Sequence, residues 1–252
     1  MTAAEHDFHT VAFPASPAAE PARGVSDAQR TLVAQDIATS LAHELRNPVF
    51  AIASAARLLR YRIVDDPVME KNIGRILREA ERLNGLVDGL LEYGRPAPVR
   101  LGAGDPDDLW NDVLQAERGA LEAKALIVRH TASSPHATCE IDGEQLAQAF
   151  AHLLANAVDA APEASDLTLT SSITSGEWRC ELRNGGEPIP AETLSRAFDL
   201  LVSNKPGHAG IGLALARRIV TDHGGTIALA SSTEHGTVAT VVLPLVSTRA
   251  RG

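Results

Sequence analysis

Residues 40–48 read Ser-Leu-Ala-His-Glu-Leu-Arg-Asn-Pro, and the apolar spacing around them predicts a long helix. The apolar positions recur at alternating intervals of four and three residues, which is typical of one seam of a helix pair. His43 lies two residues past Leu41, about 200° around the helix, so we expect its imidazole to face solvent. The seam consists of Leu41, Leu45, Pro48, Ile52, Ala55 and Leu59.

The neighbours of His43 on this helix are polar. Glu44 adjoins it, and Asn47 lies one helical turn away on the same face. An exposed imidazole beside a carboxylate and a carboxamide is the arrangement of an acid–base or nucleophilic site. An isolated histidine of this kind is more often an ordinary surface residue, so the downstream sequence has to decide between the two interpretations.

A second long helix is predicted to begin at Asp66-Pro67, an N-cap followed by proline, and to end at Gly94 and Pro96. Its apolar residues hold a heptad seam for three repeats: Met69, Ile73, Ile76, Ala80, Leu83, Val87 and Leu90. Two helices with one seam each bury too little surface alone, so we expect an antiparallel hairpin that dimerises into a four-helix bundle. The alternative is a hairpin that packs against the following domain.

Bulk properties exclude several classes of protein. The 252-residue chain has a formal net charge of -9, which argues against a nucleic-acid partner. No apolar run reaches the length of a membrane span, and the N-terminus lacks a signal-peptide pattern, so we expect no membrane association. With only Cys139 and Cys180, a reduced cytoplasmic location is expected. Residues 1–25 are rich in Ala and Pro and are predicted to be a flexible tail.

From about residue 101 the pattern changes to short strand-like runs that alternate with helical stretches. Turns at Ser175-Gly176 and His235-Gly236 are predicted to join two pairs of strands into hairpins. Helices are expected near 107–124, 143–161 and 210–220, and strands near 126–130, 167–173, 178–182, 226–231 and 237–245. This mixture predicts an α+β layer with helices on one face of a mostly antiparallel sheet.

The expected helix 143–161 has a polar stripe beside its apolar one. The polar stripe carries His152, Asn156, Asp159 and Glu163. Its hard oxygen donors suit Mg²⁺, although a solvated polar face would have the same composition.

Two glycine-rich segments follow. Asn184-Gly-Gly186 ends a strand, where glycines permit close backbone approach to a flat ligand and Asn184 can hydrogen-bond a base edge. A plain glycine turn explains that segment equally well. The loop through Lys205, Gly207 and Gly210 enters a helix at Gly212-Leu213, where backbone N–H groups and the helix dipole favour phosphate. Lys205 adds a positive charge there.

The order of these motifs resembles that of the sensor histidine kinases of two-component systems over residues 26–248. The segments around His43, Asn156, Asn184, Phe198 and Gly210-Ile-Gly212 are similar to the H, N, G1, F and G2 boxes of that family. Thr221-Asp-His-Gly-Gly225 also fits its closing segment. Two segments, Leu90-Leu-Glu-Tyr-Gly-Arg-Pro96 and Ser203-Asn-Lys205, resemble the nitrogen-regulator-type branch of the family.

The resemblance implies a dimerisation and phosphotransfer domain over residues 26–97 and a Bergerat-type ATP-binding sandwich over residues 98–248, without a sensor domain. It implies that His43 takes the γ-phosphoryl group of Mg-ATP and passes it to an Asp on a response-regulator receiver. Glu44 would orient the imidazole and accept its proton, and Asn47 would position water when the regulator is dephosphorylated. An upstream sensory partner protein is expected to supply the stimulus.

The resemblance also implies which residues hold the nucleotide. Asn156 would bind Mg²⁺, Asn184 the adenine and the glycines of residues 207–212 the phosphates. The full nucleotide-binding set implied is Asn156, Asp159, Asn184, Gly186, Lys205, Gly207, Gly210, Gly212 and Leu213.

Five positions depart from the family pattern. Asn184 stands where the family most often has Asp, and the others are His152, Pro188, Leu201 and His208. These departures keep a second hypothesis open, a histidine phosphotransferase or phosphatase with a weakened ATP site. A third, an anti-sigma-type protein kinase or ATP-gated binding module, is opposed by the long hairpin that carries His43.

Overall fold

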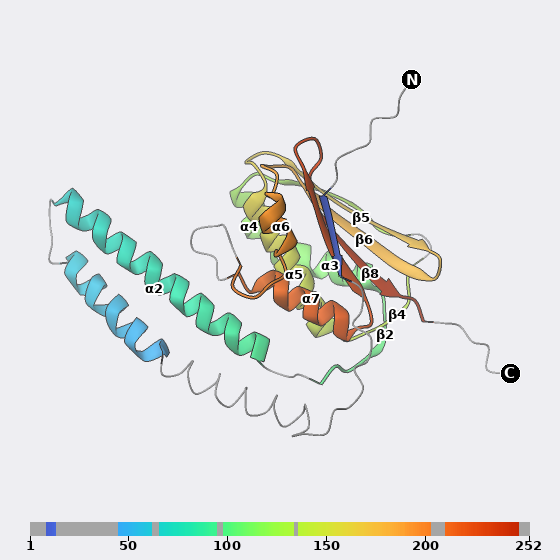
Figure 1. The fold of residues 1–252 in the computed structure, drawn as a ribbon, viewed down its shortest axis with the longest axis horizontal. Coiled ribbons are helices and arrows are strands. Elements are labelled where there is room, and N and C mark those ends of the chain that lie inside the picture. Colours follow the sequence, from blue (N-terminus) through green and yellow to red (C-terminus); the bar gives the residue numbers. More distant parts are fainter. Residues whose placement is uncertain are drawn as a thin grey trace. The chain divides into compact units, whose positions relative to one another are not determined.

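The computed structural model describes residues 9–13, 45–61, 66–94, 98–133, 136–202 and 210–246. The chain divides into two compact units, one of residues 1–17, 98–198 and 212–252, and one of residues 18–97 and 199–211 (Figure 1). Within the described ranges, no helix is long and apolar enough to cross a membrane. His43, Glu44, Lys205 and Gly207 lie outside these ranges, so the expectations for them stay predictions.

The unit of residues 18–97 and 199–211 contains a helical hairpin. Its first helix is described over residues 45–61, and its second is α2 (Pro67–Gly94). Asp66 caps α2, since its Oδ1 accepts hydrogen bonds from the backbone N–H groups of Val68 and Met69, both at 3.0 Å. This cap and Pro67 at the first helical position confirm the predicted start of the helix.

The predicted seam of the first helix is wrong about which residues the hairpin buries. Leu45, Ile52 and Leu59 are exposed. The buried residues of this helix, Val49, Ala53 and Ala56, each lie one position after a residue of the predicted seam. The small core of the hairpin consists of Val49, Ala53, Ala56, Ile73, Leu77 and Ala80. On each helix, the apolar residues cover a wider face than a contact between two helices needs. Their spacing alone therefore does not show which of them face the other helix of the hairpin.

The unit of residues 1–17, 98–198 and 212–252 contains a six-stranded sheet of order β1-β7-β8-β6-β5-β3. Every neighbouring pair is antiparallel except β3 with β5, which confirms the predicted mostly antiparallel sheet. The strands are β1 (His9–Phe13), β3 (Ile127–Thr131), β5 (Asp166–Thr174), β6 (Glu177–Asn184), β7 (Thr226–Ser232) and β8 (Gly236–Pro244). Two short strands, β2 (Gly102–Gly104) and β4 (Cys139–Ile141), form a separate pair.

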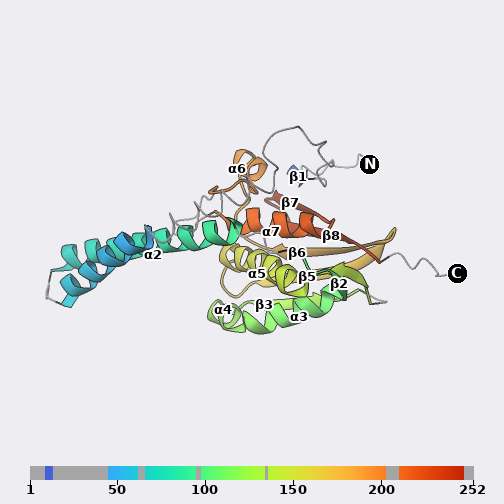
Figure 2. The ribbon, with the colours of Figure 1, turned by 90° about the horizontal axis from the view of Figure 1, so that it is seen from below.

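Helices cover one face of this sheet (Figures 1 and 2). The predicted helix near 107–124 is divided at Glu117 into α3 (Pro106–Ala116) and α4 (Arg118–Ala123). The others are α5 (Gly143–Ala160), α6 (Ala191–Ser195) and α7 (Gly212–Asp222). Three fully buried aromatic rings join α3, α5 and β6: Trp110 stacks on Phe150 at 4.3 Å between ring centroids, and Phe150 meets Trp178 at 6.1 Å.

The expected flexible tail is wrong for residues 9–13, because this segment is the edge strand β1. It pairs with β7 along its whole length, from His9 opposite Ser231 to Phe13 opposite Ile227. The sequence gives little sign of it, since a five-residue edge strand depends on a partner that lies more than 200 residues away along the chain.

Candidate nucleotide-binding site

Helix α5 is the element around which the predicted nucleotide-binding motifs gather. Its apolar face is buried against α3, α7 and the sheet, and its N-cap is Asp142, whose Oδ1 accepts a hydrogen bond from the N–H of Gln145 at 3.2 Å. Asn156 is half-buried and Asp159 is exposed, both near the C-terminal end of the helix. A rigid, buried helix therefore positions the two oxygen-bearing side chains that were predicted to face metal and nucleotide.

Asn184, the last residue of β6, is buried at 4% exposure. Its Nδ2 donates a hydrogen bond to the carbonyl oxygen of Gly185 at 2.5 Å. This fixes the carboxamide, so its oxygen can accept a hydrogen bond from an amine on a flat ligand. The backbone around it is crowded, because a Cβ at Gly236 (φ +68°) would lie 2.2 Å from the Asn184 carbonyl oxygen.

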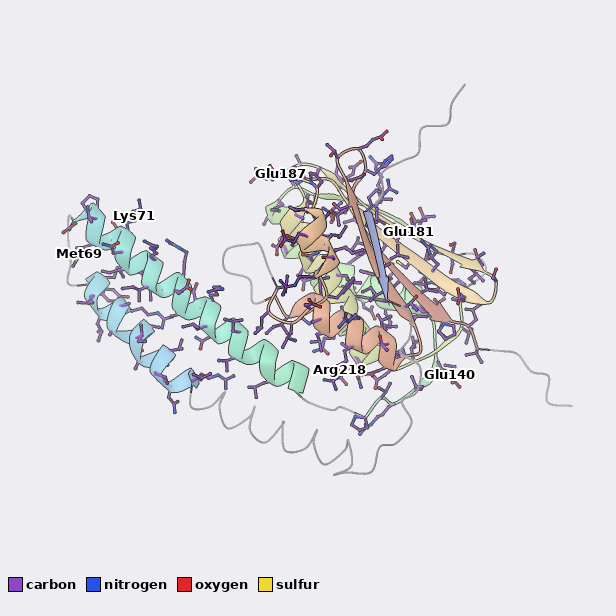
Figure 3. The ribbon with its side chains drawn as sticks, in the orientation of Figure 1. Met69, Lys71, Glu140, Glu181, Glu187 and Arg218 are labelled. Carbon is purple, nitrogen blue, oxygen red and sulfur yellow. The ribbon has the colours of Figure 1, made fainter. Side chains whose placement is uncertain are left out.

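Gly186 brings the turn after β6 against the end of α5. Its φ is +121°, and a Cβ there would lie 2.4 Å from the carbonyl oxygen of Ala160. Only glycine satisfies both the backbone conformation and this close approach. The turn and the Asn156–Asp159 stretch of α5 are therefore neighbours, as a shared site requires, while Glu187 projects outward next to them (Figure 3).

Gly212, at the start of α7, lies against His152 on α5. A Cβ at Gly212 would come within 3.2 Å of His152 Nδ1. His152 stands one turn before Asn156, so the beginning of α7 and the polar stripe of α5 adjoin. Leu213 follows and is half-buried. Gly210 has φ +68°, a conformation that favours glycine.

A polar pair on the β7–β8 hairpin supports the segment after the glycine turn. Ser231 Oγ accepts a hydrogen bond from the N–H of Ile189 at 3.0 Å and shares a second one with Thr237 Oγ1 at 2.9 Å. Both hydroxyl residues are buried. These residues were not singled out from the sequence. A Ser and a Thr at inward positions of two mainly apolar strands could have indicated a buried hydrogen-bonded pair.

His223, in the predicted closing segment, joins α7 to the start of α5. Its Nε2 accepts a hydrogen bond from the N–H of Asp142 at 2.9 Å, and its Nδ1–H donates to the carbonyl oxygen of Ile219 at 2.7 Å. A ring nitrogen that accepts from a backbone amide must be unprotonated, so this imidazole is neutral in the fold. His223 thus has a structural role at the N-terminal end of the helix that bears Asn156.

The other end of α5 is fastened by Lys124. Its ammonium donates hydrogen bonds to the carbonyl oxygens of Val158, Asp159 and Ala161 at 2.8, 3.1 and 2.9 Å. A cation on the last carbonyls of a helix also complements the helix dipole. Lys124 was not predicted to matter, because its role depends on a fold contact across more than thirty residues.

Away from the site, the described core residues include the carboxylate of Asp107 and the thiols of Cys139 and Cys180. Burial by itself would raise the pKa of Asp107, but hydrogen bonds from Ser133 and Ser171 outweigh this and lower it below the ordinary value. Burial, with the charges of Asp105 and Asp107, raises the pKa of Cys139 to about 11. Burial also raises the pKa of Cys180. Both thiols are therefore unreactive at neutral pH.

The donor set suits a metal bound largely through a substrate. Within the described part of the chain, no group of three His, Cys, Asp or Glu side chains could hold a metal ion by itself. The site offers the carboxamide of Asn156 and the carboxylate of Asp159 instead. Mg²⁺ usually takes one or two protein oxygens together with substrate phosphates, and these residues fit that pattern.

Asn47 is the one residue of the predicted phosphoacceptor group within the described ranges. It is exposed on the helix over residues 45–61, in agreement with the solvent-facing side predicted for it. The structure thus brings Asn156, Asp159, Asn184, Gly186, Gly212 and Leu213 together in one unit, and describes Asn47 on the other.

Two family models match the chain. Residues 34–98 match the His Kinase A (phospho-acceptor) domain, and residues 141–247 match the histidine kinase-, DNA gyrase B- and HSP90-like ATPase. The sensor histidine kinase ZraS of Escherichia coli (strain K12) is 30% identical over 84% of this chain and 46% of its own length. The signal transduction histidine-protein kinase AtoS of the same strain is 26% identical over 90% of this chain and 37% of its own length. The chain therefore spans less than half of either relative.

Solved structures show the same fold. Histidine kinase ThkA in complex with response regulator protein TrrA has a TM-score of 0.66 at 23% identity, covering 89% of this chain and 65% of that one. Full-length ShkA in complex with AMPPNP has a TM-score of 0.64 at 22% identity, covering 84% of this chain and 46% of that one. The expected helical phosphoacceptor region and α/β ATPase sandwich are thereby confirmed.

Proposed function

This chain carries both domains of a sensor histidine kinase, and from that premise we propose that it phosphorylates its own His43 from Mg-ATP. The phosphoryl group then passes to an Asp of a response-regulator receiver domain. The observation that carries this proposal is the gathering of three motifs at α5: Asn156 on the helix, Gly186 against its end, and Gly212 against His152.

The nucleotide-binding residues have separate roles in this proposal. Asn184 accepts a hydrogen bond from the adenine amine, and the glycines at the start of α7 bind phosphate oxygens through backbone N–H groups. Asn156 and Asp159 hold Mg²⁺, which when bound neutralises charge on the triphosphate. Lys205 and Gly207 complete the phosphate-binding loop.

The phosphoacceptor residues carry the chemistry. An unprotonated ring nitrogen of His43 attacks the γ-phosphorus, so that a nitrogen–phosphorus bond forms as the bond to the bridging oxygen of ADP breaks. Glu44 stabilises the positive charge on the ring and accepts the proton from its other nitrogen. Asn47 positions a water molecule for dephosphorylation of the regulator, a second activity of the same surface.

The exposed apolar rows of the hairpin support a homodimer. On the first helix, Leu45, Ile52 and Leu59 recur every seven residues. On α2, Met69, Ile76 and Leu83 do the same, and Met69 lies at the hairpin tip (Figure 3). All six side chains are 40–52% exposed, whereas the alternate heptad positions Ile73 and Ala80 are buried within the hairpin. A second hairpin would cover these rows as a four-helix bundle.

The test is incubation of the purified chain with radiolabelled Mg-ATP. We expect an acid-labile, alkali-stable phosphate in the wild type, no label in His43→Ala, and full labelling in the control His136→Ala, which removes an 83% exposed imidazole. A wild type that binds ATP but stays unlabelled would contradict the kinase proposal. Transfer to a receiver domain is then measured by loss of label from the kinase.

A second candidate function is a histidine phosphotransferase or phosphatase with a weakened ATP site. The buried Asn184, in the place where the family most often has Asp, favours it. This candidate predicts poor ATP binding together with phosphoryl exchange between His43 and a receiver. Tight Mg-ATP binding measured by calorimetry would remove its basis.

A further inference from the structure

Strand β1 forms one edge of the six-stranded sheet and covers β7, which would otherwise be the edge strand. His9–Phe13 pairs antiparallel with β7 over all five residues, from His9 opposite Ser231 to Phe13 opposite Ile227. An uncovered edge strand presents unpaired backbone N–H and C=O groups, which bind an added strand through main-chain hydrogen bonds. The β7 edge is thus a strand-addition site whose occupant is a segment that precedes the hairpin.

The edge that β1 covers is linked to the nucleotide loop by hydrogen bonds. Ser231, the register partner of His9, holds the N–H of Ile189 at 3.0 Å, five residues after Asn184. Ser231 also bonds Thr237 on β8 at 2.9 Å. Gly236, between them, packs directly on the Asn184 carbonyl. Movement of the Ser231 end of β7 would therefore move the loop that is proposed to hold adenine.

A second neighbour of β1 leads back to the same loop. Besides β7, β1 lies next to α6, the short helix that begins two residues after Ile189 (Figure 2). The segment from Asn184 to Ser195 is consequently bordered by β6 at its start, by Ser231 in its middle and by β1 at its end. Release of β1 from the sheet would remove one of these three neighbours of the segment.

We propose that His9–Phe13 is a docking strand that couples the N-terminal segment to nucleotide affinity. When it is added to β7, the Asn184–Ser195 segment is held in place and the nucleotide binds tightly. When an upstream partner draws it away, this segment loosens and affinity falls. An input at the N-terminus then reaches the nucleotide site through the sheet edge as well as through the hairpin. This inference needs nucleotide binding but not phosphorylation of His43.

Docking is tested in the full chain with paired cysteines. Register partners in an antiparallel pair have Cα atoms about 4.5–5.5 Å apart, within reach of a disulfide, whereas positions offset by two residues are about 7–8 Å apart. We expect Thr10→Cys/Ala230→Cys to cross-link under mild oxidation and the offset control Thr10→Cys/Ala228→Cys to cross-link at least about tenfold less. Equal cross-linking of the two pairs would overturn the docked register.

Coupling is tested with Val11→Pro/Ala12→Pro, since two successive prolines remove a ladder donor whichever residue faces β7. We expect hydrogen-exchange protection of the β7 amides to be lost and the dissociation constant for AMPPNP to rise about fivefold by calorimetry. The control Ala3→Pro/Ala4→Pro, upstream of the strand, should change neither. Lost protection with unchanged affinity would overturn the coupling, and unchanged protection would overturn the docking.

These outcomes are separable from those of the proposed kinase function. A chain that binds AMPPNP but leaves His43 unlabelled fails as a kinase, while the coupling can still be confirmed or overturned. A wild type that binds no nucleotide overturns both the coupling and the kinase proposal. The cross-linking experiment would then still test whether β1 docks on β7.

Discussion

The two units of this chain differ in how completely they bury their large apolar side chains. The ATP-binding unit, which is the unit of residues 1–17, 98–198 and 212–252, encloses Trp110, Phe150 and Trp178 completely, and its strand β6 buries every second residue. The hairpin buries only small or medium side chains around Ala53 and Ile73 and leaves two rows of large apolar residues in solvent. The ATP-binding unit has a complete core within one chain, whereas the hairpin leaves apolar surface exposed that the proposed dimer would cover.

The largest expected effect would show that the core of the ATP-binding unit is independent of the hairpin. Phe150→Ala removes the ring between Trp110 and Trp178 and should lower the free energy of unfolding of this unit by about 3–5 kcal/mol. We expect a calorimetric scan to show this unit melting earlier while cross-linking still detects hairpin dimers. Leu58→Ala, at an exposed position of the hairpin, should change neither the melting temperature of the ATP-binding unit nor the dimer cross-linking. If Phe150→Ala abolished the cross-linking as well as destabilising the ATP-binding unit, the two units would not be independent.

The next effect concerns the incomplete hairpin. Ile52→Glu places a charge in an exposed apolar row and should raise the dimer dissociation constant at least about 100-fold, because the carboxylate would be buried at the dimer contact. Sedimentation velocity across a concentration series measures it. Leu58 is 67% exposed on the same helix but lies outside the row, so Leu58→Glu is the matched control. Equal weakening by both substitutions would mean that the row is not the interface.

The same contrast explains what the sequence could predict. In the ATP-binding unit, several strands contrast clearly with their flanking turns, so Trp178-Arg-Cys180 alternation and the His235-Gly236 turn located β6 and the β7–β8 hairpin. In the hairpin, each helix carries apolar residues that are buried and others that are exposed. The heptad pattern predicted the helices, but it could not separate Ile73, which is buried inside one chain, from Ile76, which is exposed.

The parts of the site that were missed depend on contacts between distant segments. Asn156, Asn184 and Gly186 belong to local motifs that the sequence singled out, and the structure places Gly186 against the end of the helix that bears Asn156. Lys124 and Ser231 act through partners 34 and 42 residues away along the chain, and no local pattern marks such pairs. Strand β1 is the extreme case, since its pairing exists only once β7 has formed.

A smaller effect concerns Asp107, a buried carboxylate of the ATP-binding unit. The described buried residues of the hairpin include no carboxylate. Because the fold lowers the pKa of Asp107, the ionised form contributes stability above the ordinary value of 3.8, and this is lost as pH falls through the folded pKa. Asp107→Asn should lower the free energy of unfolding by about 1–3 kcal/mol at neutral pH. Urea unfolding at pH 7 and pH 3 should show the difference shrink at the lower pH. A constant difference would contradict the assignment, and Asp108→Asn, exposed on the same turn, is the control.

The smallest effect separates stability from ligand binding within the same unit. In Asn184→Asp the hydrogen bond to the Gly185 carbonyl is lost whether or not nucleotide is bound, so this loss should lower the free energy of unfolding by about 1 kcal/mol without changing affinity. The new carboxylate meets the adenine amine only in the complex, and a charged acceptor there should lower the AMPPNP dissociation constant about fivefold. Asn111→Asp makes the same change at an exposed position of α3 and should alter neither quantity. If affinity fell in Asn184→Asp, the adenine would not be bound by this side chain, and the buried carboxamide would serve the turn alone.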